Sequence, residues 1–136
     1  SRLLHTSNGF AKAGPMTEML VREPAVHALV STVTGWPLWE MASTRKKYKN
    51  RATPWEARLG MEVGHAVARQ GLSRAEVNAI AKTLRAKYDD QAADAPLGCE
   101  YHDCYDVAKA VPTQEHNDMY RRVKDEIADM GIEFPY

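Results

Sequence analysis

Three side chains of the kinds that bind metals or act as nucleophiles lie close together in the last third of the chain: Cys99, His102 and Cys104. Structural zinc usually takes four ligands, supplied in pairs from two separated segments. Here one short segment supplies all three, and their spacing matches no standard zinc pattern. The simpler interpretation is a loop with buried thiols, so we predict no metal site.

The two cysteines allow two further interpretations. A Cys99–Cys104 disulfide is compatible with their spacing, but two cysteines in 136 residues are typical of a protein from a reducing compartment. A nucleophilic cysteine needs a nearby base, which His102 could supply, yet no oxyanion-hole motif accompanies it. We favour the buried-thiol loop over both and expect a cytoplasmic protein.

A second group of candidate binding residues is the basic run at residues 45–51, which holds five cations with Tyr48 among them. Basic residues interleaved with an aromatic ring are compatible with phosphate or nucleic-acid binding. Runs of this size are more often solvated loops, and the whole chain is balanced at 18 basic and 18 acidic side chains. No apolar stretch approaches the roughly 18 residues that suggest a membrane span. We expect neither nucleic acid nor a membrane as a partner.

Helix signals dominate the elements that would position these residues. Gly14-Pro15 opens an apolar stretch, with proline at the first helical position, where its missing N–H group costs nothing. Pro24 interrupts this stretch and Gly35 ends it. The pattern predicts a kinked helix or two abutting helices.

Three further helices have clear beginnings. Capping boxes at residues 53–56 and 73–76 begin two of them. The last begins at Thr113 and stops at Gly131, after which Ile132 is placed to pack back onto the helix. These signals make the chain mainly α.

Strand signals are confined to residues 1–14, with a loop predicted at residues 6–9, and residues 36–51 show no regular pattern. The helices nevertheless carry wide apolar faces. They must pack either on one another or on a sheet that lies outside this chain, and periodicity alone does not distinguish these alternatives.

Several short motifs, in a fixed order, give the chain a resemblance to a known family. They are Ala13-Gly14-Pro15-x-Thr17-Glu18-Met19, Glu56-Ala57-Arg58, Glu62-Val63, Glu76-Val77-Asn78, Ala95-Pro96 with Gly98, Cys104-Tyr105-Asp106-Val107, Pro112-Thr113-x-Glu115 and Tyr120. With these motifs the chain resembles the C-terminal portion of the monomethylamine:corrinoid methyltransferases over nearly its whole length.

The resemblance implies the C-terminal part of a (β/α)8 TIM barrel with additional C-terminal helices. The last strand and helix would fall in about residues 1–35, and an appended helical region in about residues 36–136. A whole barrel needs about 250 residues, and the chain begins with Ser1 rather than Met. We therefore expect most of the barrel to lie upstream, where its strands would cover the apolar helix faces.

The resemblance also implies a reaction. Members of the family transfer the methyl group of monomethylamine to the cobalt of a corrinoid that a separate protein carries, and they hold the amine on a pyrrolysine residue. No position of this chain corresponds to that residue, so the implied catalytic residue is upstream. The implied partners are a corrinoid protein, a methylated amine and further copies of the protein in a homo-oligomer, with no cofactor bound directly.

Two residues of this chain, Asn8 and Phe10, stand where the family has a substrate-site Gln and Tyr just before the Ala-Gly-Pro motif. Asn8 keeps a shorter amide, whereas Phe10 lacks the hydroxyl and its hydrogen bond, which predicts an altered amine preference. Since Asn8-Gly9 is also a strong turn signal, a plain turn residue is the alternative for Asn8.

We therefore predict the C-terminal part of a methylamine:corrinoid methyltransferase, or of a paralogue with another amine substrate, and expect this part alone to be inactive. The alternative, from a different class of protein, is a stand-alone helical interaction module. Its contact surface would be residues 36–39 and 45–51.

Overall fold

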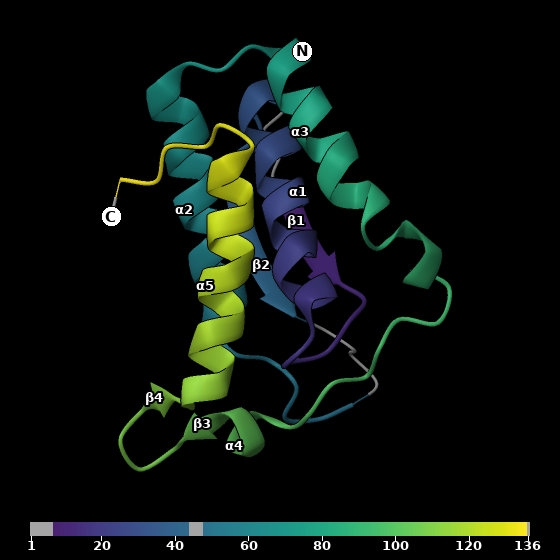
Figure 1. Ribbon diagram of the computed structural model, residues 1–136, viewed down its shortest axis with the longest axis vertical. Coiled ribbons are helices and arrows are strands. Elements are labelled where there is room, and N and C mark those ends of the chain that lie inside the picture. The colour runs from purple at the N-terminus through teal and green to yellow at the C-terminus, as the bar shows by residue number, and fades with distance from the viewer. Residues whose placement is uncertain (1–6, 44–47, 136) are drawn as a thin grey trace.

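The computed structural model describes the backbone of residues 7–43 and 48–135 and the side chains of residues 9–37 and 48–135. Helices dominate this part of the chain (Figure 1). In chain order the elements are β1 (Ser7–Ala11), α1 (Glu18–Thr34), β2 (Leu38–Ser43), α2 (Pro54–Gln70), α3 (Arg74–Ala86), the 3-10 turn η1 (Asp89–Gln91), α4 (Tyr101–Cys104), β3 (Tyr105–Asp106), β4 (Val111–Pro112) and α5 (Gln114–Asp129).

Strands β1 and β2 pair in parallel and are joined by α1, which makes a β–α–β unit with the helices on one face of the pair (Figure 1). The prediction that strands are confined to residues 1–14 is therefore wrong, because β2 lies outside that range. The loop predicted at residues 6–9 is also wrong, since residues 7–9 belong to β1. Both errors have one cause: a parallel ladder joins segments about thirty residues apart, and no local pattern reports it.

Helix α1 begins later than the sequence predicts. Its N-cap is Thr17, so Gly14-Pro15 lies in the loop before the helix rather than in its first turn. The helix then runs unbroken through Pro24, and two abutting helices do not form. Proline removes one backbone hydrogen bond, and the packing of the buried face outweighs that loss. Gly35 ends the helix at φ +76°, as predicted.

The other predicted helix starts are confirmed. Helices α2 and α3 begin with capping boxes, in which the Glu56 carboxylate accepts the Thr53 N–H at 2.9 Å and the Glu76 carboxylate accepts the Ser73 N–H at 2.8 Å. Helix α5 begins after its N-cap, Thr113. These boundaries were predictable because caps depend on residues within one helical turn.

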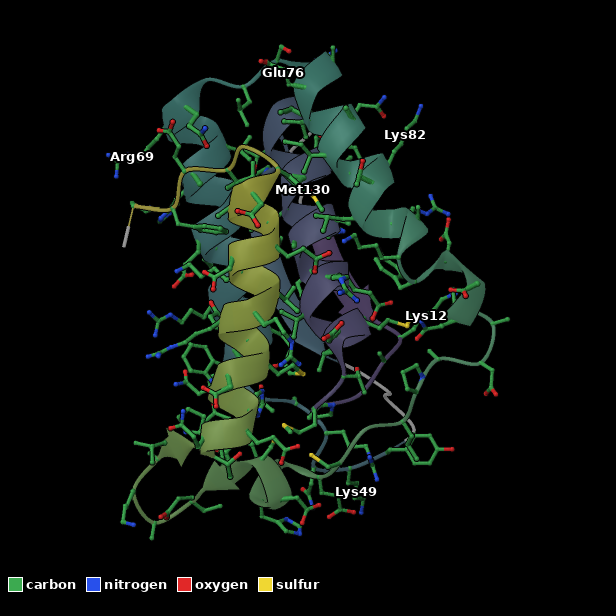
Figure 2. All side chains as sticks on the ribbon, in the orientation of Figure 1. Lys12, Lys49, Arg69, Glu76, Lys82 and Met130 are labelled. Carbon is green, nitrogen blue, oxygen red and sulfur yellow. The ribbon has the colours of Figure 1, made fainter. Side chains whose placement is uncertain are left out.

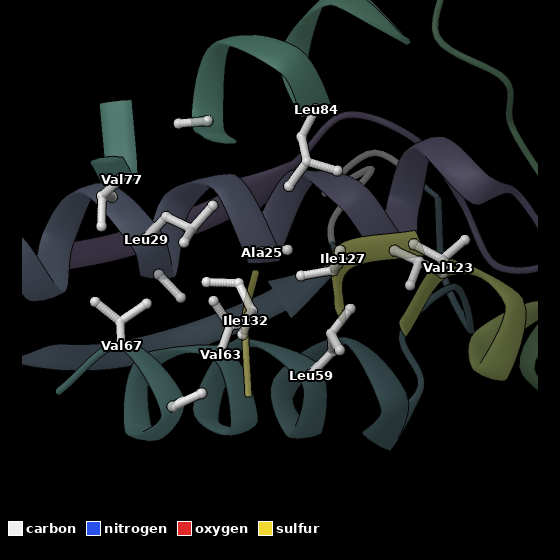
Figure 3. Close-up of a cluster of buried hydrophobic side chains, with 14 of the residues drawn as sticks. Ala25, Leu29, Leu59, Val63, Val67, Val77, Leu84, Val123, Ile127 and Ile132 are labelled. Carbon is white, nitrogen blue, oxygen red and sulfur yellow. The ribbon is translucent and has the colours of Figure 1, made fainter. Parts of the chain in front are cut away.

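One hydrophobic core is shared by α1, α2, α3 and α5, and Ile132 from the C-terminal tail packs into it as predicted (Figure 3). Each fully buried aliphatic side chain contributes about 1.5–3 kcal/mol relative to an exposed one. Of the two packing alternatives, the structure therefore shows these helices packing on one another. The large side chains that are completely buried in this core are Leu29 of α1, Leu59 and Val63 of α2, Leu84 of α3, and Val123 and Ile127 of α5.

A buried carboxylate joins α2 to α5. Glu62 is 2% exposed, and it accepts hydrogen bonds from Arg58 Nε at 2.6 Å, Lys124 Nζ at 2.7 Å and the Tyr120 hydroxyl at 3.0 Å. The network fixes the register of the two helices. Within the described ranges, no helix has the length and apolar character needed to cross a bilayer.

Candidate functional site

The parallel strands β1 and β2 end at the same edge of their pair, at Ala11 and Ser43. In proteins built from parallel strands, ligands bind at this carboxyl edge, among the loops that follow the strands. The candidate site therefore lies here. Its described walls are the first loop, residues 12–17 after β1, and the second loop, residues 48–53 before α2 (Figure 1).

Glu23 ties the first loop to α1. Its carboxylate accepts the backbone N–H of Lys12, at 3.0 and 2.9 Å to its two oxygens, and that of Ala13 at 3.1 Å. At the far end of the loop, the Thr17 hydroxyl donates to the Gly14 carbonyl at 2.7 Å. Because charge-assisted bonds to backbone N–H groups are among the stronger hydrogen bonds, they fix the path of the loop.

A segment that follows α3 crosses the first loop. We call residues 95–101 the crossing segment; it leads along the strand-end edge of the molecule into α4 (Figure 1). The Gly14 N–H donates to the Pro96 carbonyl at 2.9 Å, and the Cys99 N–H donates to the Pro15 carbonyl at 3.0 Å. Two motifs that carry the family resemblance, Ala-Gly-Pro and Ala-Pro-x-Gly, thus bond to each other.

Arg51 ties the crossing segment to the second loop. Its Nη1 donates to the carbonyls of Leu97 at 2.9 Å and Gly98 at 2.6 Å. Beside it, the Tyr101 N–H donates to the Asn50 carbonyl at 2.6 Å. One segment therefore holds both loops of the candidate site.

The contacts of Arg51 correct the interpretation of residues 45–51 as a solvated loop. Arg51 is half-buried and bonded, whereas residues 45–47 lie outside the described residues. Its partners are backbone carbonyls 46 and 47 positions away, so no local motif could have predicted them. The charge of the run was visible in the sequence, but its target was not.

Both predicted site residues lie in β1, shortly before the strand ends at Ala11. Asn8 pairs with Glu40 of β2, so the alternative of a turn residue is wrong; its side chain lies outside the described residues. Phe10 is 48% exposed. Its neighbour Ala11 is buried with residues of α1, and Phe10 itself borders a cavity beside the strand.

A cavity of about 260 Å³ opens beside β1, between α1 and the end of α3. Burial lowers the pKa of His27 there. Burial, with a smaller contribution from the negative charge of Glu23, raises the pKa of Tyr88 to about 12. Both groups are therefore neutral at neutral pH. The lining residues are Gly9, Phe10, Ala11, Glu23, Pro24, Val26, His27, Arg85 and Tyr88.

The buried-thiol interpretation of the cysteine loop is confirmed for Cys104, whereas Cys99 is only half-buried. Cys99 and Cys104 are free, and the fully buried Cys104 thiol donates to the Tyr101 carbonyl at 3.4 Å. Burial raises the pKa of Cys99 and raises that of Cys104 to about 12, so neither thiol is an activated nucleophile. His102 is exposed beside Glu100 and Asp103. Among the side chains that the structure describes, residues 9–37 and 48–135, no group of three ligand-type residues is placed to hold a metal ion.

Glu56 is a buried acid whose burial the sequence did not reveal. It is 2% exposed, and one oxygen accepts the N–H and hydroxyl of Thr53 at 2.9 and 2.8 Å. Burial raises its pKa to about 7, against the opposing effect of these hydrogen bonds. Its capping role was predictable, but its approach to Cys104 and Tyr105 was not. Its negative charge contributes to the raised pKa values of both residues, which lie almost fifty positions away in the sequence.

A parallel β–α–β unit, helices on one face and loops held at the carboxyl edge define the C-terminal part of a TIM-barrel enzyme with additional helices. A sequence model of the monomethylamine methyltransferase MtmB family matches residues 1–132. The chain belongs to this family.

Individual relatives place the chain within their sequences. It is 34% identical over 123 residues to monomethylamine methyltransferase MtmB2 of Methanosarcina barkeri, covering 90% of this chain and 26% of the relative. It is 32% identical to MtmB of Methanosarcina mazei, over 90% of this chain and 26% of that relative. The match lies in the C-terminal portion of these proteins.

Solved structures agree. The crystal structure of the Methanosarcina barkeri monomethylamine methyltransferase superposes with a TM-score of 0.83 at 32% identity, over 91% of this chain and 27% of that one. A crystal structure of a hydroxylamine complex of MtmB gives the same values. The chain thus spans about a quarter of the length of these relatives.

Proposed function

We propose that this chain is the C-terminal segment of an enzyme that transfers a methyl group from monomethylamine, or a related methylated amine, to the cobalt of a corrinoid protein. The family membership carries the proposal. The position of β1 supports it, because Asn8 and Phe10 lie just before the carboxyl edge, where parallel-strand enzymes bind substrates.

The segment contributes one wall of the amine site. Phe10, half exposed on β1, offers the amine an apolar ring without a hydroxyl. A site that lacks one hydrogen-bonding group discriminates differently among small amines, because each amine N–H must find another partner. The substrate is therefore an amine that needs one polar contact fewer than the family site provides.

The corrinoid is carried by a partner protein and supplies the cobalt that accepts the methyl group. The pyrrolysine that the family resemblance implies lies upstream, so the segment alone does not catalyse transfer. We expect the whole protein to be a cytoplasmic homo-oligomer, and light scattering of the purified protein measures its oligomeric state.

The test is methyl transfer by the whole protein that contains this segment. It is incubated with a reduced corrinoid protein and, in turn, with mono-, di- and trimethylamine, while the cobalt absorbance is followed. We expect methyl-cobalt with one of these amines and none with the 136-residue chain alone. Chemical methylation by methyl iodide serves as the control for reactive cobalt; transfer from no amine, with this control positive, refutes the proposal.

A further inference from the structure

We propose that Arg51 is a positioning residue of the amine site: it holds the crossing segment, which in turn holds the first loop and the end of β1. The inference rests on the proposed function, because it assigns the residue to the amine site of that enzyme. Nothing in the family match assigns a role to this arginine.

Arg51 holds the crossing segment through a single nitrogen atom. A single nitrogen, Nη1, reaches two successive carbonyls, Leu97 at 2.9 Å and Gly98 at 2.6 Å. The guanidinium is planar, always charged and carries several donors in a fixed arrangement, so it can bond both carbonyls at once. A lysine ammonium, on a more flexible stem, is a weaker substitute.

The crossing segment and the first loop make a rigid contact. A Cβ atom on Gly14 would lie 1.8 Å from the Leu97 carbonyl oxygen, and one on Gly98 would lie 2.1 Å from the Pro15 carbonyl oxygen. The two backbones are therefore in direct contact, with a hydrogen bond on each side of it. A shift of the crossing segment must move the loop with it.

A small buried cluster connects the first loop to the end of β1, where the site residues lie. Ala11 and Ala13 are buried in one small cluster with Met19, Leu20 and Ala95, which joins the strand end, α1 and the crossing segment. Phe10 precedes this cluster directly. A loosened crossing segment would displace the first loop and the end of β1. Because a misplacement of about 1 Å at a reacting centre costs roughly 100-fold in rate, this displacement would slow the reaction.

The experiment compares Arg51→Ala and Arg51→Lys in the whole protein, with Arg69→Ala as the matched control. Arg69 is an exposed arginine in the last turn of α2 and lies at the other end of the molecule from Lys49 of the second loop (Figure 2). The readouts are the KM for the amine, the KM for the corrinoid protein, kcat, and hydrogen exchange at the amides of Gly14 and Cys99.

We expect Arg51→Ala to lower kcat/KM for the amine by roughly 10- to 100-fold, to leave the KM for the corrinoid protein unchanged, and to speed exchange at both amides. Arg51→Lys falls between it and the wild type, and Arg69→Ala matches the wild type. A folded Arg51→Ala protein with wild-type amine kinetics overturns the proposal. The proposal is also overturned if the activity of the variants falls only in proportion to the fraction of folded protein. If Arg51→Ala does not fold, the same comparison is made with Arg51→Lys.

Failure of the proposed function gives a different result. If the wild-type protein transfers methyl groups from no amine, the exchange rates decide alone. If the Gly14 and Cys99 amides of Arg51→Ala are as protected from exchange as in the wild type, Arg51 does not position the first loop. If they lose protection while the core stays folded, Arg51 does position this loop.

Discussion

Gly14 and Gly98 lie backbone to backbone: a Cβ atom on Gly98 would sit 2.5 Å from the Gly14 carbonyl carbon. The two residues are 84 positions apart in the sequence. Their contact joins the loop after β1 to the segment that precedes α4, so the additional helical region directly supports the candidate site.

This contact predicts the effect of Gly98→Ala, for which the chain offers a matched control. Gly98 and Gly71 have nearly the same backbone angle, φ +66° and +64°, but only Gly98 has atoms within reach of an added Cβ. Gly71→Ala should cost about 1 kcal/mol of unfolding free energy, from the backbone angle alone. Gly98→Ala should cost roughly 1–3 kcal/mol more, from overpacking. Equal costs in urea unfolding would mean that the two backbones do not touch.

Glu56 predicts a pH dependence of stability. Its pKa rises from 4.5 to about 7 on folding because of burial, so the folded state holds the proton more tightly than the unfolded state. The resulting stability is complete below pH 4.5 and is lost as the pH rises through 7. The full loss is about 3 kcal/mol at about 1.4 kcal/mol per pKa unit.

Glu56→Gln should abolish this loss, so that the variant gains on the wild type between pH 5 and pH 8 in chemical unfolding. Comparing the two proteins at each pH cancels the contributions of other groups, among them the buried His116, whose pKa is lowered by burial. A difference in unfolding free energy that does not change with pH would contradict a raised pKa for Glu56.

The buried Glu62 network predicts the cost of a single hydroxyl. Tyr120→Phe removes the hydrogen bond to a nearly inaccessible carboxylate that also bonds Lys124 and Arg58. Hydrogen bonds to charged groups contribute about 1.5–3 kcal/mol, and Tyr120→Phe should lower the unfolding free energy by this amount. In Glu62→Gln the same substitution should cost less, which a double-mutant cycle measures. Identical costs in both backgrounds would show that the two side chains are not coupled.

The cysteine loop predicts slow thiol chemistry. Cys104 is fully buried and has a pKa of about 12, so iodoacetamide at pH 8 should leave it unmodified in the folded protein and modify it on unfolding. Cys104→Ser identifies the signal by mass spectrometry. The purified protein should contain less than about 0.1 equivalent of zinc. A structural zinc ion binds tightly enough to survive purification, so metal analysis would detect it if the site existed. Rapid labelling of Cys104 or a full equivalent of zinc would contradict the buried-thiol interpretation.

Local signals predicted the helices well. The caps at Thr53, Ser73 and Thr113 and the stop at Gly35 all depend on neighbours within one turn, and each is confirmed. The parallel pairing of β2 with β1 escaped the sequence because its hydrogen bonds join distant segments and the intervening helix sets their register.

The candidate site was predicted only in part. The resemblance directed attention to Asn8 and Phe10, whose roles stay predictions, and to the motifs around Gly14 and Gly98. It did not show that these motifs touch, because the contact is between backbones. Arg51 was visible only as one charge in a basic run, since its carbonyl partners leave no pattern in the sequence. The boundary between the last barrel strand and helix, about residues 1–35, and the appended helical region, about residues 36–136, also stays a prediction.

We propose that this chain forms one wall of a methylamine methyltransferase site and that β1 supplies two residues of that site, Asn8 and Phe10. The most direct measurement replaces the matching quarter of the Methanosarcina barkeri relative with this chain and follows monomethylamine-dependent methylation of cobalt. We expect a folded chimaera with kcat/KM lowered by at least about 10-fold, because a hydrogen bond to the substrate is missing. Asn8→Gln with Phe10→Tyr should restore most of the loss. A folded chimaera whose activity these two substitutions leave unchanged would contradict the account.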